Sequence, residues 1–163
     1  ISDAASGFTS VTYPFPVIRI ADLYLMYAEA LNEKGEDYAT VLPWIDMVRE
    51  RSGLQGVKES WDQYVGNSKY ATQTGLRQII MQERRIELAF EGHYFWDVRR
   101  WKTATTELTQ PLTGWKVRYG ETDVDYYSEN LVLVRDFTPK MYFWPIDIGE
   151  LRKDPNLVQN YGW

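Results

Sequence analysis

Three glutamates, Glu83, Glu87 and Glu91, are spaced four residues apart and would share one face of a helix. Two carboxylates about 5 to 9.5 Å apart are the equipment of glycoside hydrolysis, so this spacing raises an acid/base hypothesis. The surrounding residues are largely apolar and leave no room for a sugar ring between the carboxylates. We therefore favour structural ion pairs involving Glu83, Glu87, Arg84 and Arg85, and we predict no catalytic residue.

The need for ion pairs follows from the helix expected over residues 76–101. At about 100° per residue, Glu83 and Glu87 fall in the middle of an apolar stripe, where an unpaired carboxylate is costly to bury. We expect at least one of the two to be buried and paired with an arginine. The candidate partners are Arg19, Arg49, Arg84 and Arg85.

Other reactive chemistry has little support in the sequence. His93 and Asp97 are four residues apart, as two metal ligands on one helix face would be, but no third ligand is nearby and zinc sites use three or four. The chain has no cysteine, no glycine-rich phosphate loop and no G-x-S-x-G elbow. We predict no metal site and no cofactor.

Aromatic residues make up 15% of the chain, and tyrosine and tryptophan combine a flat face with a polar tip that suits sugar binding. Four tryptophans lie in helical or apolar settings and are predicted to be core: Trp44, Trp96, Trp101 and Trp144. Five rings lie in loop-like sequence and are better candidates for exposure: Trp61, Tyr64, Tyr70, Tyr126 and Tyr127. The predicted ligand contacts are Trp61, Tyr64, Tyr126 and Tyr127, and the alternative is that the loops fold back with their rings covering the structure beneath.

The elements that would position these residues are mostly helices. Residues 18–35 have helical periodicity, with Ile20, Leu23, Tyr24, Tyr27 and Leu31 on the expected inner face. A second helix should run from an Asp37 cap to about residue 51, with Val41, Trp44, Ile45 and Val48 inside. The third, over residues 76–101, has Thr74 as a plausible cap and Gly92 as a break. Two apolar stripes are expected on this helix. The first is Leu76, Ile80, Phe90, Tyr94, Val98 and Trp101, and the second is Met81, Leu88 and Phe95.

The remaining segments have other patterns. Residues 54–73 predict a loop with a short helical turn at 59–65, residues 115–119 and 131–137 predict a hairpin, and residues 141–163 predict irregular chain. The fold class is therefore mainly α: a tetratricopeptide-like helical pair plus a long buried helix, with a small β-hairpin and an irregular C-terminal segment.

Size and charge set further limits. The chain of 163 residues is predicted to be a single domain over residues 1–163. Its net charge is −5 and no Lys/Arg run forms a patch, which argues against nucleic acid or an anionic membrane as a partner. No apolar run approaches the roughly 20 residues that a membrane-spanning helix needs.

Three stretches resemble the SusD/RagB family of outer-membrane nutrient-binding lipoproteins. They are IRIADLYLMYAEALNEKG at 18–35, ERRIELAFEGHYFWDVRRW at 83–101 and YFWPIDIGELRKDPNLVQNYGW at 142–163. They occur in the family's order. The chain departs from the pattern at Asp147 and Tyr161, where the family often has proline. Since family members are several times longer, the resemblance implies the C-terminal part of such a protein.

The resemblance implies a non-enzymatic surface protein that binds oligosaccharide, or in some members peptide, and delivers it to a SusC-like TonB-dependent transporter. It also implies an outer-membrane location, with a lipid anchor outside these residues. Two alternatives remain: a helical-repeat scaffold that binds only protein, and a glycoside hydrolase.

Overall fold

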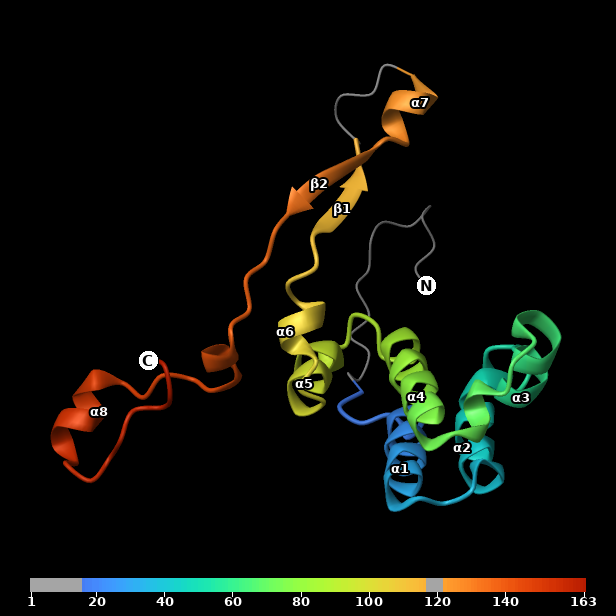
Figure 1. Ribbon diagram of the computed structural model, residues 1–163, viewed down its shortest axis with the longest axis horizontal. Coiled ribbons are helices and arrows are strands. Elements are labelled where there is room, and N and C mark those ends of the chain that lie inside the picture. Colours follow the sequence, from blue (N-terminus) through green and yellow to red (C-terminus); the bar gives the residue numbers. More distant parts are fainter. Residues whose placement is uncertain (1–15, 117–121) are drawn as a thin grey trace, which may run out of the picture. The chain divides into compact units, whose positions relative to one another are not determined.

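The computed structural model of the protein describes residues 16–116 and 122–163, and its regular structure is mostly helical (Figure 1). In chain order the elements are α1 (Ile20–Lys34), α2 (Tyr38–Arg51), α3 (Val57–Ser60), the π-helical turn η1 (Trp61–Val65), the 3₁₀ turn η2 (Lys69–Ala71), α4 (Gln73–Glu87), α5 (His93–Arg100), α6 (Ala104–Glu107), β1 (Leu112–Trp115), α7 (Asp123–Tyr126), β2 (Glu129–Leu133), the 3₁₀ turn η3 (Pro139–Tyr142) and α8 (Ile148–Lys153). The predicted mainly α fold is confirmed.

These elements fall into two compact units, one within residues 1–91 and the other within residues 92–163. That the whole chain forms one domain, the C-terminal part of a longer protein, stays a prediction.

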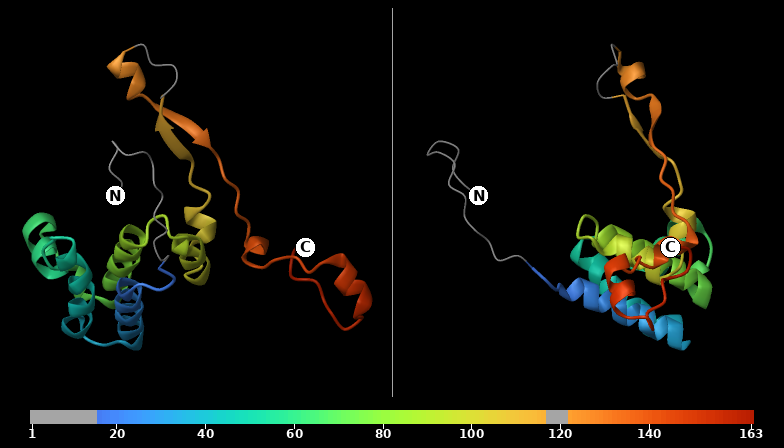
Figure 2. Two further views of the ribbon diagram at one scale, coloured as in Figure 1. Left: turned by 180° about the vertical axis from the view of Figure 1, so that it is seen from behind. Right: turned by 90° about the vertical axis from the view of Figure 1, so that its left-hand side faces the viewer.

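In the first unit, α1, α2 and α4 pack against one another, as Figures 1 and 2 show for the blue to green helices. A three-residue turn joins α1 to α2, and it begins at Gly35 with φ +89°, a left-handed conformation that glycine adopts without a Cβ penalty. At the other side of the turn, Asp37 accepts a hydrogen bond from the Ala39 N–H at 2.8 Å and caps α2. Both helix boundaries agree with the sequence prediction.

The buried face of α1 differs from the predicted one. Ala21, Leu25 and Ala28 are buried, whereas Leu23 and Tyr27, which we expected on the inner face, are about half exposed. Two alanines on the buried stripe let the neighbouring helices approach closely, and Leu23 and Tyr27 lie on the flank.

On α2 the predicted inner face is confirmed for Val41, Ile45 and Val48, which are all buried. Trp44 lies at the edge of this face and is half-buried. Its ring centroid lies 5.7 Å from that of Tyr24 and 4.7 Å from that of Tyr27, so these rings cover the flank between α1 and α2.

The helix expected over residues 76–101 is interrupted, as the glycine predicted. α4 ends at Glu87, and both Phe90 (φ +67°) and Gly92 (φ +83°) have left-handed backbones before α5 begins. The single helical phase on which the predicted stripes depend therefore ends at Glu87. Phe90, predicted to lie on the buried stripe, is fully exposed. The predicted Thr74 cap was also wrong, because Thr72 accepts the Gly75 N–H at 3.1 Å.

The second unit holds α5, α6, a two-stranded sheet and the C-terminal turns. β1 and β2 pair antiparallel, with Leu112 opposite Leu133 and Trp115 opposite Glu129. The predicted hairpin is confirmed, but both strands begin earlier than expected, and residues 117–121 of the first predicted strand and the loop lie outside the described residues. The buried core of this unit is small and consists of Val98, Ala104 and Phe137.

Candidate functional site

Glu83 and Glu87, the two carboxylates of the predicted apolar stripe, both form ion pairs with arginines from earlier in the chain. Glu83 pairs with Arg49, and the side chains of the two residues are only 12% and 15% exposed. Glu87, 10% exposed, accepts hydrogen bonds from Arg19 at 2.8 Å and from Arg51 at 2.7 Å. These contacts tie α4 to α2 and to the residue that precedes α1.

The neighbouring charges join the same arrangement. Arg19 also donates to Glu91 at 2.6 Å, and its hydrogen bonds to the Glu91 and Glu87 carboxylates raise the pKa of the Arg19 guanidinium. Arg84 is almost fully buried and donates to Asp22 at 2.9 Å, which joins α4 to α1. Arg85 is half-buried on α4. All three glutamates of the acid/base hypothesis are thus held by arginine.

Three exposed rings gather at the end of the hairpin. Trp115 closes β1, Tyr126 ends the short helix α7, and Tyr127 follows it. The ring centroids of the two tyrosines lie 5.0 Å apart, and those of Trp115 and Tyr127 lie 5.1 Å apart. Trp115 and Tyr127 are 59% and 60% exposed. We call Trp115, Tyr126 and Tyr127 the ring cluster.

Local hydrogen bonds place the ring cluster. Thr122 caps α7 by accepting the Asp125 N–H at 3.2 Å, which turns the chain back toward the strand. The Lys116 N–H then donates to the Tyr126 carbonyl at 3.1 Å and extends the pairing past Trp115. The two tyrosines were predicted as adjacent loop rings, of which at least one would be exposed. Trp115 was missed, because its register opposite Glu129 depends on the strand pairing.

The chemistry around the ring cluster suits a hydroxylated ligand. Asp123 and Asp125 are exposed and lie within three residues of Tyr126 in the sequence. Glu129 is also exposed and pairs with Trp115 across the two strands. Carboxylates accept hydrogen bonds from hydroxyl groups, while rings offer flat apolar faces. Together they provide the two kinds of contact that a sugar residue needs.

The second predicted pair of rings behaves differently. Trp61 and Tyr64 lie in η1, so the predicted helical turn is present, but Trp61 packs against the core and Lys69 lies 5.4 Å from its ring centroid. Tyr64 remains well exposed. Tyr70, grouped with the exposed loop rings, is buried, and its hydroxyl donates to Asp62 at 2.8 Å. This bond and burial raise the pKa of the Tyr70 hydroxyl.

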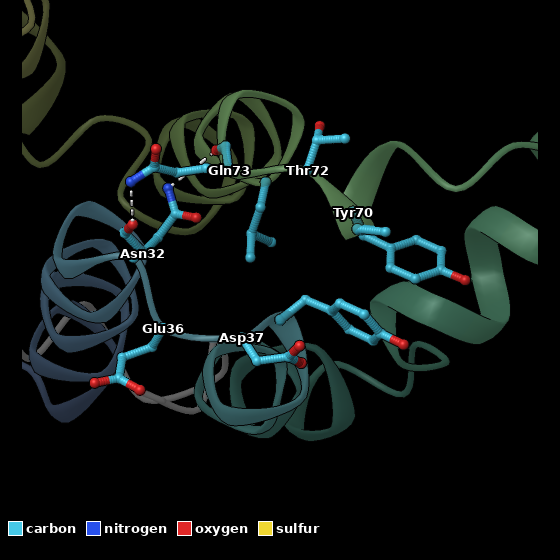
Figure 3. A pocket seen from close by; sticks show the side chains of 10 residues that line it. Asn32, Glu36, Asp37, Tyr70, Thr72 and Gln73 are labelled. Atoms are coloured by element: carbon cyan, nitrogen blue, oxygen red, sulfur yellow. Dashed lines mark hydrogen bonds between the residues drawn. The ribbon is translucent and has the colours of Figure 1, made fainter.

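The first unit also contains a polar cavity of about 330 Å³, where the turn between α1 and α2 meets η2 and the start of α4 (Figure 3). Its lining is Asn32, Gly35, Glu36, Asp37, Tyr38, Tyr70, Ala71, Thr72, Gln73 and Leu76. Such a volume is at the low end for small-molecule sites.

The polar groups of this cavity are ordered by hydrogen bonds. The Asn32 side-chain nitrogen donates to the Gln73 carbonyl at 3.1 Å, and the Gln73 side-chain nitrogen donates back to the Asn32 carbonyl at 2.7 Å. Figure 3 shows Asp37 across the cavity from this pair, and Glu36 pointing away from it. The groups can accept hydroxyl donors, but the cavity presents less aromatic face than the ring cluster.

Two tryptophans predicted as core are instead exposed. Trp96 on α5 and Trp144 before α8 each expose about three fifths of their surface. The prediction was wrong because helical periodicity does not reveal which face a small unit leaves open. Trp44 and Trp101 are half-buried.

Residues 16–116 and 122–163 contain neither a candidate metal site nor a helix fit to cross a membrane. These residues bring together no group of three or more His, Asp or Glu side chains fit to hold a metal ion, and Asp97 instead accepts a hydrogen bond from Arg100 at 2.7 Å. In the same ranges, every helix is too short or too polar to span a bilayer.

The chain is similar to known proteins over most of its length. Residues 2–163 match the family described as the SusD family. SusD-like protein P25 of Formosa agariphila is 39% identical over 144 residues, which is 88% of this chain and 23% of that protein. SusD-like protein P2 of the same organism is 37% identical over 98 residues, 60% of this chain and 18% of the relative. The chain thus spans about a quarter or less of these relatives.

Solved structures show the same likeness. A SusD-like protein from Bacteroides fragilis is 30% identical with a TM-score of 0.73, and the match covers 93% of this chain and 28% of that one. A SusD-like carbohydrate-binding protein from the same species is 32% identical with a TM-score of 0.67, covering 88% and 28%. The family match over nearly all residues confirms the resemblance seen in the three sequence stretches, and the chain belongs to the SusD family.

Proposed function

We propose that this protein binds glycan without cleaving it, and that the ring cluster of Trp115, Tyr126 and Tyr127 supplies a contact surface. The observation that carries the proposal is three mutually contacting, exposed rings beside exposed carboxylates, in a chain of the SusD family. A solved relative is described as a carbohydrate-binding protein, which supports the same class of ligand.

The proposal that the protein is not an enzyme rests on the ion pairs. Glu83, Glu87 and Glu91 each bond to arginine, which is a structural use of a carboxylate. The test is sugar release from a glycan panel. Enzyme-proportional release that Glu83→Gln or Glu91→Gln abolishes would establish the hydrolase alternative.

Delivery and location complete the proposal. We infer that bound oligosaccharide passes to a SusC-like TonB-dependent transporter, and that the protein sits on the outer-membrane surface through a lipid anchor outside these residues. These inferences follow from family membership. Co-purification with a TonB-dependent transporter, and labelling of intact cells, would test them.

The binding experiment uses the full-length protein and a panel of neutral and acidic oligosaccharides. We expect Trp115→Ala and Tyr127→Ala each to weaken binding about fivefold, since a stacking ring contributes about 1 kcal/mol. Tyr126→Ala, Trp61→Ala and Tyr64→Ala test the other predicted contacts, and Tyr161→Ala is an exposed-ring control. Unchanged affinity in all of the ring-cluster variants would place the ligand elsewhere.

A protein-binding scaffold is the second candidate, and one observation favours it. Ile18, just before α1, and Ile20 and Leu23 at its start are exposed and form an apolar surface of the kind that packs against other protein. If no oligosaccharide of the panel binds, and Ile20→Asp abolishes capture of a transporter, the scaffold function replaces glycan binding.

A further inference from the structure

Three cations surround a cavity at the end of α5. Arg99 and Arg100 are the last two residues of the helix, and Lys102 follows two residues later. Together with Tyr142 and Phe143 they line a cavity of about 430 Å³ within the second unit. We call this the cationic cavity. It shares no residue with the ring cluster, and its lining is cationic.

Arg99 is held in place by aromatic rings. Its guanidinium carbon lies 4.5, 5.2 and 5.4 Å from the ring centroids of Phe95, Trp144 and Phe137. One terminal nitrogen donates to the Tyr142 carbonyl at 3.1 Å, while the buried Nε has no hydrogen-bond partner among the described residues. Rings orient and stabilise a guanidinium without neutralising it, so Arg99 keeps its full charge.

The local charge balance is positive. Arg99, Arg100 and Lys102 supply three positive charges, and Asp97 offsets one of them through its 2.7 Å bond to Arg100. The C-terminus of α5 contributes about half a negative elementary charge. The sum of these groups is therefore about one and a half positive charges at the cavity.

Lys102 occupies a position that favours glycine. Its φ is +58°, and its N–H donates to the Arg99 carbonyl at 3.1 Å while the Thr103 N–H donates to the Val98 carbonyl at 2.9 Å. This is the helix-ending pattern in which the left-handed residue is usually glycine. A lysine is less favourable than glycine in this backbone conformation. Strained positions of this kind often have a functional role, which here would belong to the lysine side chain.

We propose that the cationic cavity binds the acidic group of a charged glycan, a uronate carboxylate or a sulfate ester. The Arg99 fork and the Lys102 ammonium contact the anion, and the exposed Phe143 ring beside them faces the sugar. The inference rests on the proposed glycan binding and specifies the ligand as acidic.

The test compares two matched ligand pairs on the full-length protein: oligogalacturonate with its methyl ester, and a sulfated galactan oligosaccharide with its desulfated form. The expected result is that at least one acidic member binds tenfold or more tightly than its neutral partner, and that this preference shrinks as salt is raised. Which pair shows the preference distinguishes carboxylate from sulfate.

Lys102→Gly is the deciding variant, because glycine suits the left-handed backbone and the fold is kept. It should remove most of the acid preference, whereas Lys102→Arg should retain it. Lys153→Ala removes the same charge from an exposed position on α8 and should change nothing.

The outcomes separate this inference from the proposed function. Equal binding of acidic and neutral members, an acid preference that survives Lys102→Gly, or an equal loss in Lys153→Ala overturns the cationic cavity and leaves glycan binding in place. Absence of binding by every oligosaccharide overturns both.

Discussion

The two units treat their large side chains and their charges differently. In the first unit, twelve apolar residues form the described core and arginines face carboxylates, as Arg49 does with Glu83. In the second unit, three residues form the core, Arg99 faces aromatic rings, and Trp96, Trp115 and Trp144 are exposed. The first unit therefore has the character of a scaffold, and the second exposes the rings and cations that we propose as ligand contacts.

The contrast has a physical basis. A carboxylate neutralises the arginine that it contacts and can join two helices in a low-dielectric setting, which serves stability. A ring holds an arginine in position and leaves its charge available to an anion. The same residue type therefore has a structural use in the first unit and, as we propose, a binding use in the second.

The largest expected effect tests whether stability resides in the first unit. Leu25 is fully buried, and Leu25→Ala should lower the free energy of unfolding by about 3 kcal/mol through the cavity that it leaves. The matched change Leu131→Ala on the exposed hairpin should cost less than about 0.5 kcal/mol. Urea unfolding measures both, and comparable losses would erase the contrast between the units.

The next effect tests the ion pairs. Glu87→Ala removes a mostly buried carboxylate from Arg19 and Arg51, and we expect a loss of about 2 kcal/mol. The value lies below that for a fully buried pair because both arginines retain some exposure. Glu150→Ala, which breaks an exposed pair with Lys153, should cost less than about 0.5 kcal/mol. A Glu87→Ala loss below about 1 kcal/mol would mean that solvent already satisfies the carboxylate.

Lys102 and Gly35 both have left-handed backbones at the end of a helix, so exchanging the residue types tests whether the lysine is strained. Lys102→Gly at the end of α5 should raise the free energy of unfolding by about 0.5 to 1 kcal/mol, because φ is +58°. Gly35→Lys at the end of α1 should lower it by about 1 kcal/mol, since no atom lies within 4 Å of the added Cβ and only the backbone is strained. If Lys102→Gly instead destabilises, the lysine has a structural role and the strain argument fails.

The smallest effect concerns pH. The Arg77 guanidinium holds the pKa of Glu33 below its usual value, so the pair stabilises the folded state above about pH 4.5 and loses this as pH falls through the folded pKa. Because the pair is exposed, the contribution is about 0.5 kcal/mol or less. Arg77→Met should therefore differ from wild type at pH 7 and converge with it in acid; urea midpoints at pH 7 and pH 3 give the comparison.

The sequence by itself determined the features that depend on neighbouring residues. Gly35 predicted the end of α1, Asp37 predicted the start of α2, and Gly92 predicted the break after α4. These features could be predicted because helix caps and left-handed turns depend on neighbouring residues. The placement of Glu83 and Glu87 on an apolar stripe likewise predicted arginine partners, since burial of an unpaired carboxylate is costly.

Only the tertiary structure decided which faces meet. The buried stripe of α1 is Ala21, Leu25 and Ala28 and not Leu23 and Tyr27, because the choice of face depends on all the helices that pack together. Strand register brought Trp115 to the tyrosines, and the approach of Tyr142 and Phe143 to the end of α5 formed the cavity that Arg99, Arg100 and Lys102 line. Helical period and composition contain no information about these contacts, so the ring cluster and the cationic cavity became visible only in three dimensions.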